Sequence, residues 1–246
     1  MNLRPLMAYL PWHARDVAVK VFAPFLLFFV LSGIPLGVFS GQTGLPLFGG
    51  EPRVQALALS LWGSTASLCI LIGSVLLMNG TFSLDREKQH VRVLFAHQVA
   101  PELYYLQRFA VGLGLFAASF VLVPVLYSQI VAVPVLGTLL ALLLTGFFIG
   151  SLLLLIGAVT QRDGLVFIGV YMIANVLQTV TQGGNGPAWL RGLAWFLPPV
   201  KQASNFAGAW LAGRTVEPQD LVLVLGYGIG MLVSALVLIK RAPLVR

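Results

Sequence analysis

The sequence is short of charge. Of its 246 residues only 9% are charged and 58% are hydrophobic, whereas about a quarter of the residues of a typical soluble domain are charged. This composition excludes a soluble globular protein and predicts an integral membrane protein that is entirely α-helical. The net charge of +7 indicates basic residues held beside anionic lipid head groups, so membrane lipids are expected partners and nucleic acid is not.

Groups for covalent or metal chemistry are also scarce. The single cysteine, Cys69, lies inside a hydrophobic run, which excludes a disulfide framework and a thiolate metal cluster. His90 and His97 are seven residues apart with no third ligand nearby, so we expect no metal site. No Gly-x-Ser-x-Gly elbow or other catalytic pattern occurs, and no GxxxxGK[ST] loop is present. The chain is therefore not expected to be an enzyme, nor to hydrolyse ATP alone.

Acidic residues are absent from the apolar runs. All eight lie in predicted loops or at the ends of runs: Asp16, Glu51, Asp85, Glu87, Glu102, Asp163, Glu217 and Asp220. A proton-coupled transporter usually carries ionisable groups at membrane depth. Their absence argues against a self-sufficient proton antiporter and leaves open a sodium site built from backbone carbonyls.

What is abundant is apolar sequence, which falls into six runs, each about as long as the roughly 20 residues needed to cross a bilayer. The predicted spans are 21–39, 56–78, 109–131, 135–159, 164–181 and 221–239. Residues 1–20 predict an interfacial helix with Trp12 at head-group depth. We expect Pro24 to be tolerated in the first turn of the first span and Pro35 to kink or end that span.

The segment 182–219 differs from these spans because it combines tryptophans with prolines and few charges. It predicts two outer re-entrant half-helices, near Ala188–Phe196 and Lys201–Ala212. Six crossings place both termini on one side. With the termini inside, the inner segments hold eleven of the 15 Lys and Arg residues, so both termini are predicted to be cytoplasmic.

The fifth span carries an uncharged polar stripe. Asn175, Gln178 and Thr179 recur at i, i+3 and i+4 and so share one helix face. They fit either a translocation path or subunit seam, or hydrogen bonds between helices of one bundle. Small residues also recur every four positions, at Gly146 and Gly150 and from Gly226 to Ser234, and these are expected to pack helices within the subunit.

A charged segment, 83–108, lies between the second and third spans. Asp85, Arg86, Glu87 and Lys88 alternate in sign, and Val91, Leu94 and Phe95 then recur at helical spacing. Pro101 followed by Glu102 predicts the first turn of the next helix. The segment could be only a topology anchor, but its alternating charges favour docking into a groove of a cytoplasmic protein.

These features together resemble the permease subunits of type-2 ABC transporters (ABC-2 type). The resemblance covers nearly the whole chain and rests on the order of spans, the run Asp85-Arg86-Glu87-Lys88, the patch Val93-Leu94-Phe95 and Pro101. The sequence departs from the family pattern at Gln89-His90-Val91, where family members commonly have small residues.

The resemblance implies a multi-pass permease in the cell membrane, a prokaryotic inner membrane, working as a dimer with a second copy or a paralogue. A separate ABC ATPase would bind ATP and Mg²⁺, so the chain itself needs no cofactor, and a lipid, glycan, drug or peptide would move outward. The implied ATPase-coupling residues are Asp85, Arg86, Glu87, Val91, Leu94 and Phe95, and the implied path or dimer seam is Asn175, Gln178 and Thr179. Alternatives are a haem-export or cytochrome-maturation permease, a non-transporting membrane scaffold, and an intramembrane enzyme.

Overall fold

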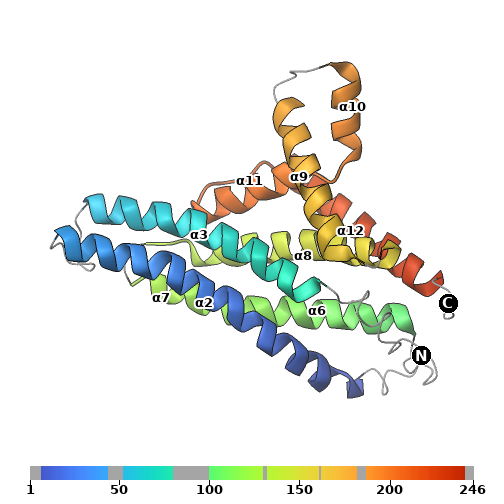
Figure 1. The fold of residues 1–246 in the computed structure, drawn as a ribbon, viewed down its shortest axis with the longest axis horizontal. Coiled ribbons are helices and arrows are strands. Elements are labelled where there is room, and N and C mark those ends of the chain that lie inside the picture. The colour runs from blue at the N-terminus through green and yellow to red at the C-terminus, as the bar shows by residue number, and fades with distance from the viewer. Residues whose placement is uncertain are drawn as a thin grey trace.

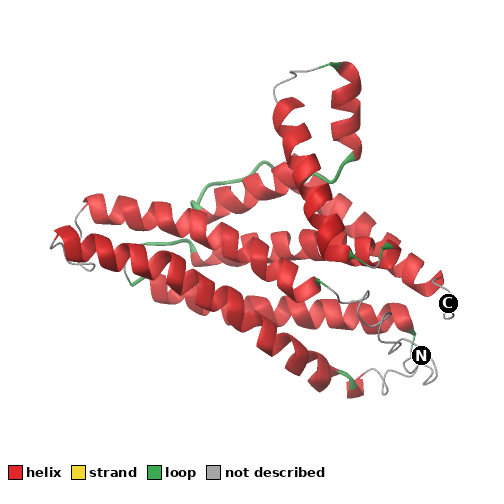
Figure 2. Cartoon of the chain, viewed as in Figure 1, coloured by secondary structure: helices red, strands yellow, loops and turns green. Residues whose placement is uncertain are grey.

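The computed structural model describes residues 7–43, 52–79, 100–129, 132–160, 162–181 and 187–241, without the side chains of 19, 21, 32–43, 52–54 and 220. All regular structure in these ranges is helical, as predicted (Figures 1 and 2). In chain order the helices are α2 (Leu10–Thr43), α3 (Pro52–Met78), α6 (Pro101–Phe120), α7 (Leu122–Tyr127), α8 (Val135–Val159), α9 (Asp163–Thr181), α10 (Ala188–Phe196), α11 (Val200–Leu211) and α12 (Pro218–Arg241).

Five stretches of the described residues are long and apolar enough to cross a membrane. They are Gln55–Met78, Pro101–Tyr127, Val135–Val159, Asp163–Thr181 and Leu221–Arg241. This finding indicates a multi-pass membrane protein, and each stretch overlaps one predicted span.

The N-terminal part differs from its prediction. Residues 10–20 are not a separate interfacial helix, because α2 runs from Leu10 to Thr43 as one helix of 34 residues. Pro11 lies in its first turn, where a missing N–H costs nothing. Pro24 lies in the middle of α2 rather than in a first turn, and it removes only one backbone hydrogen bond. The first span is predicted to kink or end at Pro35; it does not end there, since α2 continues to Thr43, and a kink there stays a prediction.

The third predicted span begins earlier than expected, at Pro101, where the proline and Glu102 form the first turn as predicted. Near its other end the helix is interrupted between α6 and α7. Pro124 has no N–H to donate to the carbonyl four residues back, which explains the interruption. Val121 keeps helical angles (φ −57°, ψ −28°), so α7 continues the direction of α6.

The core is built around α8. In the most apolar stretch of this helix, 72% of the residues are buried. Gly146 and Gly150 let its neighbours approach closely. A Cβ at Gly146 would lie 2.6 Å from Leu113 Cδ1 on α6, and one at Gly150 would lie 2.7 Å from Phe109 Cε2 on α6 and 3.1 Å from Met78 Cγ on α3. The prediction that this pair packs helices within the subunit is confirmed.

The small-residue stripe of α12 does not behave in the same way. No described atom lies within 4 Å of a Cβ built at Gly226 or Gly230, and the prediction that this stripe packs inside the subunit is wrong. Gly228 instead faces Phe147 of α8, with a Cβ-to-Cε1 distance of 2.5 Å. The buried face of α12 follows a different register: Val224, Gly228, Met231, Ala235 and Ile239.

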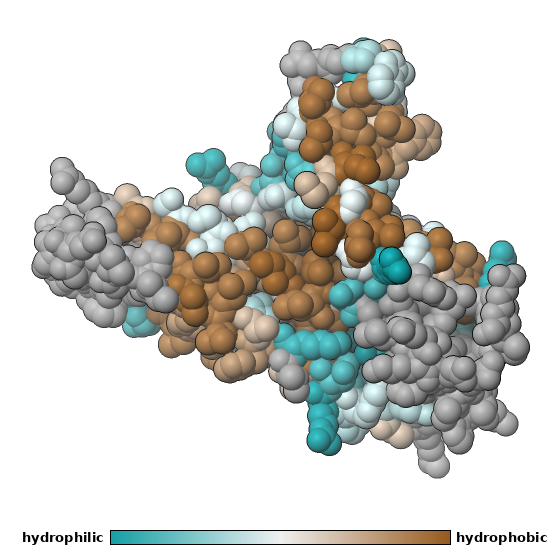
Figure 3. All heavy atoms as spheres, viewed as in Figure 1, coloured by the Kyte–Doolittle hydropathy of each residue, from teal (hydrophilic) through white to brown (hydrophobic). Residues whose placement is uncertain are grey.

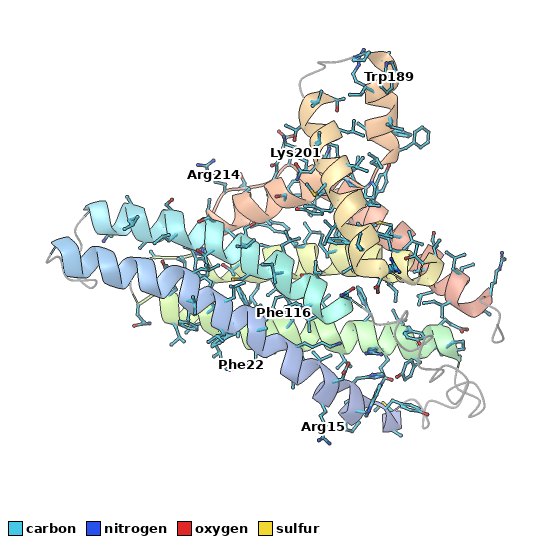
Figure 4. All side chains as sticks on the ribbon, viewed as in Figure 1. Arg15, Phe22, Phe116, Trp189, Lys201 and Arg214 are labelled. Atoms are coloured by element: carbon cyan, nitrogen blue, oxygen red, sulfur yellow. The ribbon has the colours of Figure 1, made fainter. Side chains whose placement is uncertain are left out.

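Beside the bundle, α9 projects outward and α10 packs alongside it (Figure 1). Only 17% of the most apolar stretch of α9 is buried, although its sequence is as apolar as a membrane span. Trp189 lies near the tip of the projection (Figure 4). The two short helices predicted near 188–196 and 201–212 are α10 and α11.

The surface separates apolar from polar regions along the bundle. Hydrophobic atoms cover its middle and much of the α9–α10 projection, while hydrophilic atoms gather towards the end at which α2 begins (Figure 3). The start of α2 and the end of α12 lie at this same end (Figure 1). We call it the charged end.

Candidate functional site

The charged end is held together by ion pairs between helices distant in sequence. Asp16 Oδ2 of α2 accepts a hydrogen bond of 2.9 Å from Arg108 Nη2 of α6, and it lies 3.5 Å from Lys20 Nζ. The Arg108 guanidinium also lies 5.7 Å from the centre of the Trp12 ring. A charge-assisted bond of this kind is worth about 1.5–3 kcal/mol when shielded from water, and it fixes the start of α2 against α6.

His13 is buried beside this ion pair, within an aromatic group. Its ring centre lies 4.7 Å from that of Tyr104 and 5.4 Å from that of Trp12. Neither ring nitrogen has a hydrogen-bond partner among the described residues. Burial, and then the nearby charge of Arg108, lower the pKa of His13 to about 4 against the opposing effect of Asp16. His13 is therefore neutral at pH 7.

The predicted ATPase-coupling residues Asp85, Arg86, Glu87, Val91, Leu94 and Phe95 lie outside the described residues. The helix ends on either side of them are described. Asn79, just after α3, packs against the start of α9, because a Cβ at Gly164 would lie 2.7 Å from Asn79 Oδ1. Glu102 Oε1, in the first turn of α6, lies 3.8 Å from Lys240 Nζ of α12.

Of the polar stripe on α9, Gln178 is the most fully engaged. Its side chain is 8% exposed and lies against the connection from α10 to α11. Its Nε2 donates to the carbonyl of Pro198 at 2.7 Å, and its Oε1 accepts from the backbone N–H of Lys201 at 3.0 Å. The amide thus satisfies one carbonyl before α11 and one of the orphan N–H groups in the first turn of α11.

The other two members of the stripe are less buried. Thr179 Oγ1 donates to the carbonyl of Asn175 at 2.7 Å and accepts from Lys201 Nζ at 2.9 Å. Lys201 lies where α11 meets α9 (Figure 4). The stripe therefore joins α9 to α11 by hydrogen bonds within one chain, which is one of the two readings that the sequence left open. A role in a path or a dimer seam stays a prediction.

A pocket of about 420 Å³ lies between α3, α8, α9 and α11. Small residues create it, because Gly63 on α3 and Ala203, Ala207 and Gly208 on α11 line its walls with little side-chain volume. Its polar groups are hydroxyls from all four helices: Ser64, Ser67, Thr145, Tyr171 and Ser204. Among the residues that the structure describes, no charged one lines it.

Sequence reasoning did not predict this pocket. The pattern that could have predicted it is the clustering of small residues on one face of α3 and on one face of α11. Gly63, Ser64 and Ser67 share a face of α3, and Ala203, Ser204, Ala207 and Gly208 share a face of α11. The sequence does not reveal that these two faces lie opposite each other.

Comparisons with protein-family models, with curated proteins and with solved structures find no match for this chain. No family is therefore assigned on similarity, and function must be argued from the residues themselves.

Proposed function

We propose that this chain is the transmembrane permease subunit of an ATP-driven ABC exporter of the ABC-2 type. On this proposal α2 contains the first span, 21–39, which brings the five apolar stretches to six spans; both termini are cytoplasmic, and α10 and α11 are the outer re-entrant helices. A separate ATPase subunit binds ATP and Mg²⁺ and docks on the segment 83–108. The substrate is a lipid, glycan, drug or peptide.

One observation carries the proposal: α3 connects the charged segment to the pocket. The helix ends at Met78, with only residues 79–82 between it and that segment, and several of its residues from Gly63 to Leu71 line the pocket. Fifteen residues of helix separate Gly63 from Met78, or about 22 Å at 1.5 Å per residue. A rigid helix of this length transmits a displacement at the charged end to the pocket wall.

The surroundings of the charged segment support the same reading. The helix end before it packs against α6, α8 and α9 through close contacts at Gly112, Gly150 and Gly164. The helix after it starts beside α12 through the pair Glu102–Lys240. A partner that moves the segment therefore acts on several helices at once, which is what an ATP-driven change of the bundle requires.

The exposed apolar faces of α9 and α12 support a dimer. Large apolar side chains on α9 are more than half exposed, among them Leu165, Ile173 and Val176. Gly226 and Gly230 on α12 also have no neighbour among the described residues, and small residues at this spacing let helices of two copies approach closely. We assign these faces to a second copy or a paralogue of the chain.

The proposal is tested by gentle purification of the tagged chain from its native membranes. We expect a stoichiometric ATPase to co-elute and to hydrolyse ATP. Glu87→Arg should abolish co-elution or coupled ATPase activity while the chain still inserts into membranes. Arg162→Glu is the matched control, because Arg162 is an exposed charge beside the start of α9 and outside the charged segment.

Two results would contradict the proposal. Elution without an ATPase, under conditions that keep other membrane complexes intact, would favour a non-transporting scaffold. Equal loss of ATPase activity in Glu87→Arg and Arg162→Glu would show that the charged segment has no special role in coupling.

A further inference from the structure

Thr145 differs from the other hydroxyl residues of α8. Thr138 donates to the carbonyl of Pro134 at 2.9 Å, and Ser151 donates to that of Phe147 at 2.7 Å. Both bonds run four residues back, which is the usual way for a hydroxyl to be satisfied inside an apolar helix. Thr145 is 8% exposed and lines the pocket, yet its Oγ1 has no partner among the described residues.

An unsatisfied hydroxyl in the middle of an apolar helix has a cost. Moving such a group from water into an apolar surrounding without a partner costs about 1–3 kcal/mol. A ligand that supplies a hydrogen-bonding atom removes this cost. The pocket also falls within the range of about 300–1,000 Å³ that ligand sites commonly occupy.

An apolar groove continues from this pocket. It encloses about 260 Å³ between α3 and α9, and its walls include Val75, Leu76, Phe167 and Met172. Leu71 and Tyr171 line both the pocket and the groove, so the two spaces adjoin. The hydroxyl-lined pocket thus lies beside an apolar surface.

We propose that this pair of spaces binds a neutral amphiphile, a lipid alcohol, ester or amide, with its hydrocarbon chain in the groove and its uncharged polar group in the pocket. The pocket offers hydroxyls that can donate to or accept from such a group. Its described lining offers no cation for a phosphate or carboxylate and no anion for an amine, and an unpaired charge buried there would be strongly disfavoured.

The proposal deepens the proposed function and rests on it for the membrane setting of α3 and α9. It names neutral amphiphiles as the ligand class of the pocket. Its test measures binding and not ATP hydrolysis. If the chain binds the amphiphile but never co-elutes with an ATPase, the binding site stands and the transporter role fails. If the chain co-elutes with an ATPase but does not bind the amphiphile, the transporter role stands and the binding site fails.

The experiment uses the full-length chain in lipid nanodiscs and a photoactivatable, alkyne-tagged monoacylglycerol. Its phosphate monoester, with the same chain, is the charged probe. Gly63→Leu fills the pocket, because no described atom lies within 4 Å of a Cβ at Gly63. Gly169→Leu on α9 is the matched control, since it has the same free space but lines neither cavity. Ser204→Leu fills the pocket from the opposite wall.

We expect saturable labelling by the neutral probe, with adducts on α3, α9 or α11, and at least tenfold weaker labelling by the phosphate. Gly63→Leu and Ser204→Leu should each reduce labelling about tenfold, and Gly169→Leu should leave it unchanged. Thr145→Val keeps the shape and removes one hydrogen bond, so the Kd should rise about 2- to 10-fold.

Three results would overturn the proposal. Equal labelling by both probes would refute the selectivity for a neutral group. Adducts spread over the exposed apolar faces, insensitive to both filling variants, would show only surrounding bulk lipid. An unchanged Kd in Thr145→Val would remove Thr145 from the site. Thermal unfolding of each variant confirms that it is folded before its binding is compared.

Discussion

Replacing Gln178 by leucine removes two hydrogen bonds at once. The buried amide is bonded to the carbonyl of Pro198 and to the N–H of Lys201, so Gln178→Leu leaves both groups without this partner. Interhelical hydrogen bonds in membrane proteins contribute about 0.6 kcal/mol on average and up to about 1.7. We therefore expect a loss of about 1–3 kcal/mol, which corresponds to a fall in Tm of about 3–10 °C for a chain of this size.

Asn175→Leu is the matched control for this prediction. Asn175 has the same amide group on the same helix, but the one hydrogen bond of its side chain among the described residues is a marginal one, in which Thr179 Oγ1 donates to its Oδ1 at 3.5 Å. Its Tm should therefore change by about 1–2 °C at most. Tryptophan fluorescence during heating measures both variants in the same detergent. Equal shifts would refute the view that the two hydrogen bonds of Gln178 hold the start of α11.

Further predictions concern the packing and the charged end. Gly150→Ala should lower the free energy of unfolding by about 1–3 kcal/mol, because the added Cβ would overlap the buried ring of Phe109. Gly114→Ala is the control, because a Cβ there has free space and should not destabilise the protein. Thermal unfolding in detergent measures the stability of both variants. Because burial lowers the pKa of His13 to about 4, below its unfolded value near 6.5, the unfolded state takes up the proton first as the pH falls. Unfolding measured against pH should therefore show stability lost between about pH 6.5 and 4, and His13→Phe should remove that loss. Asp16→Asn weakens the bond to Arg108 and should cost about 1 kcal/mol; a loss no larger than that of a surface variant would contradict it.

The apolar runs predicted most helices well because length and hydropathy set them. The predicted span 135–159 coincides with α8, and α9 differs from its span by one residue at the start. The errors in the first span arose at prolines. A proline near a helix start or inside a long apolar helix removes one hydrogen bond and need not end the helix, so α2 passes Pro24 and Pro35 without a break.

Contacts between helices could not be predicted in the same way. The two small-residue motifs look alike in sequence, yet Gly150 packs against Phe109 and Gly230 has no described neighbour. Which face of a uniformly apolar helix points inward depends on its neighbours, and in a membrane the apolar pattern gives little guidance because lipid is as apolar as the core. The position of Thr145 opposite the small faces of α3 and α11 is a property of the assembled bundle for the same reason.

The position of α12 has a consequence for how the chain is made. Its buried face covers α8, and Ala235 and Ile239 pack with Tyr104 and Tyr105 of α6. The first residue of α12 follows the last residue of α8 by 59 positions (218 minus 159), or about 3–12 seconds of synthesis at 5–20 residues per second. During that interval the most buried helix has one side uncovered, so a chain stalled before α12 exposes the Phe147 side of α8, which Gly228 of α12 otherwise covers, to membrane proteases and chaperones.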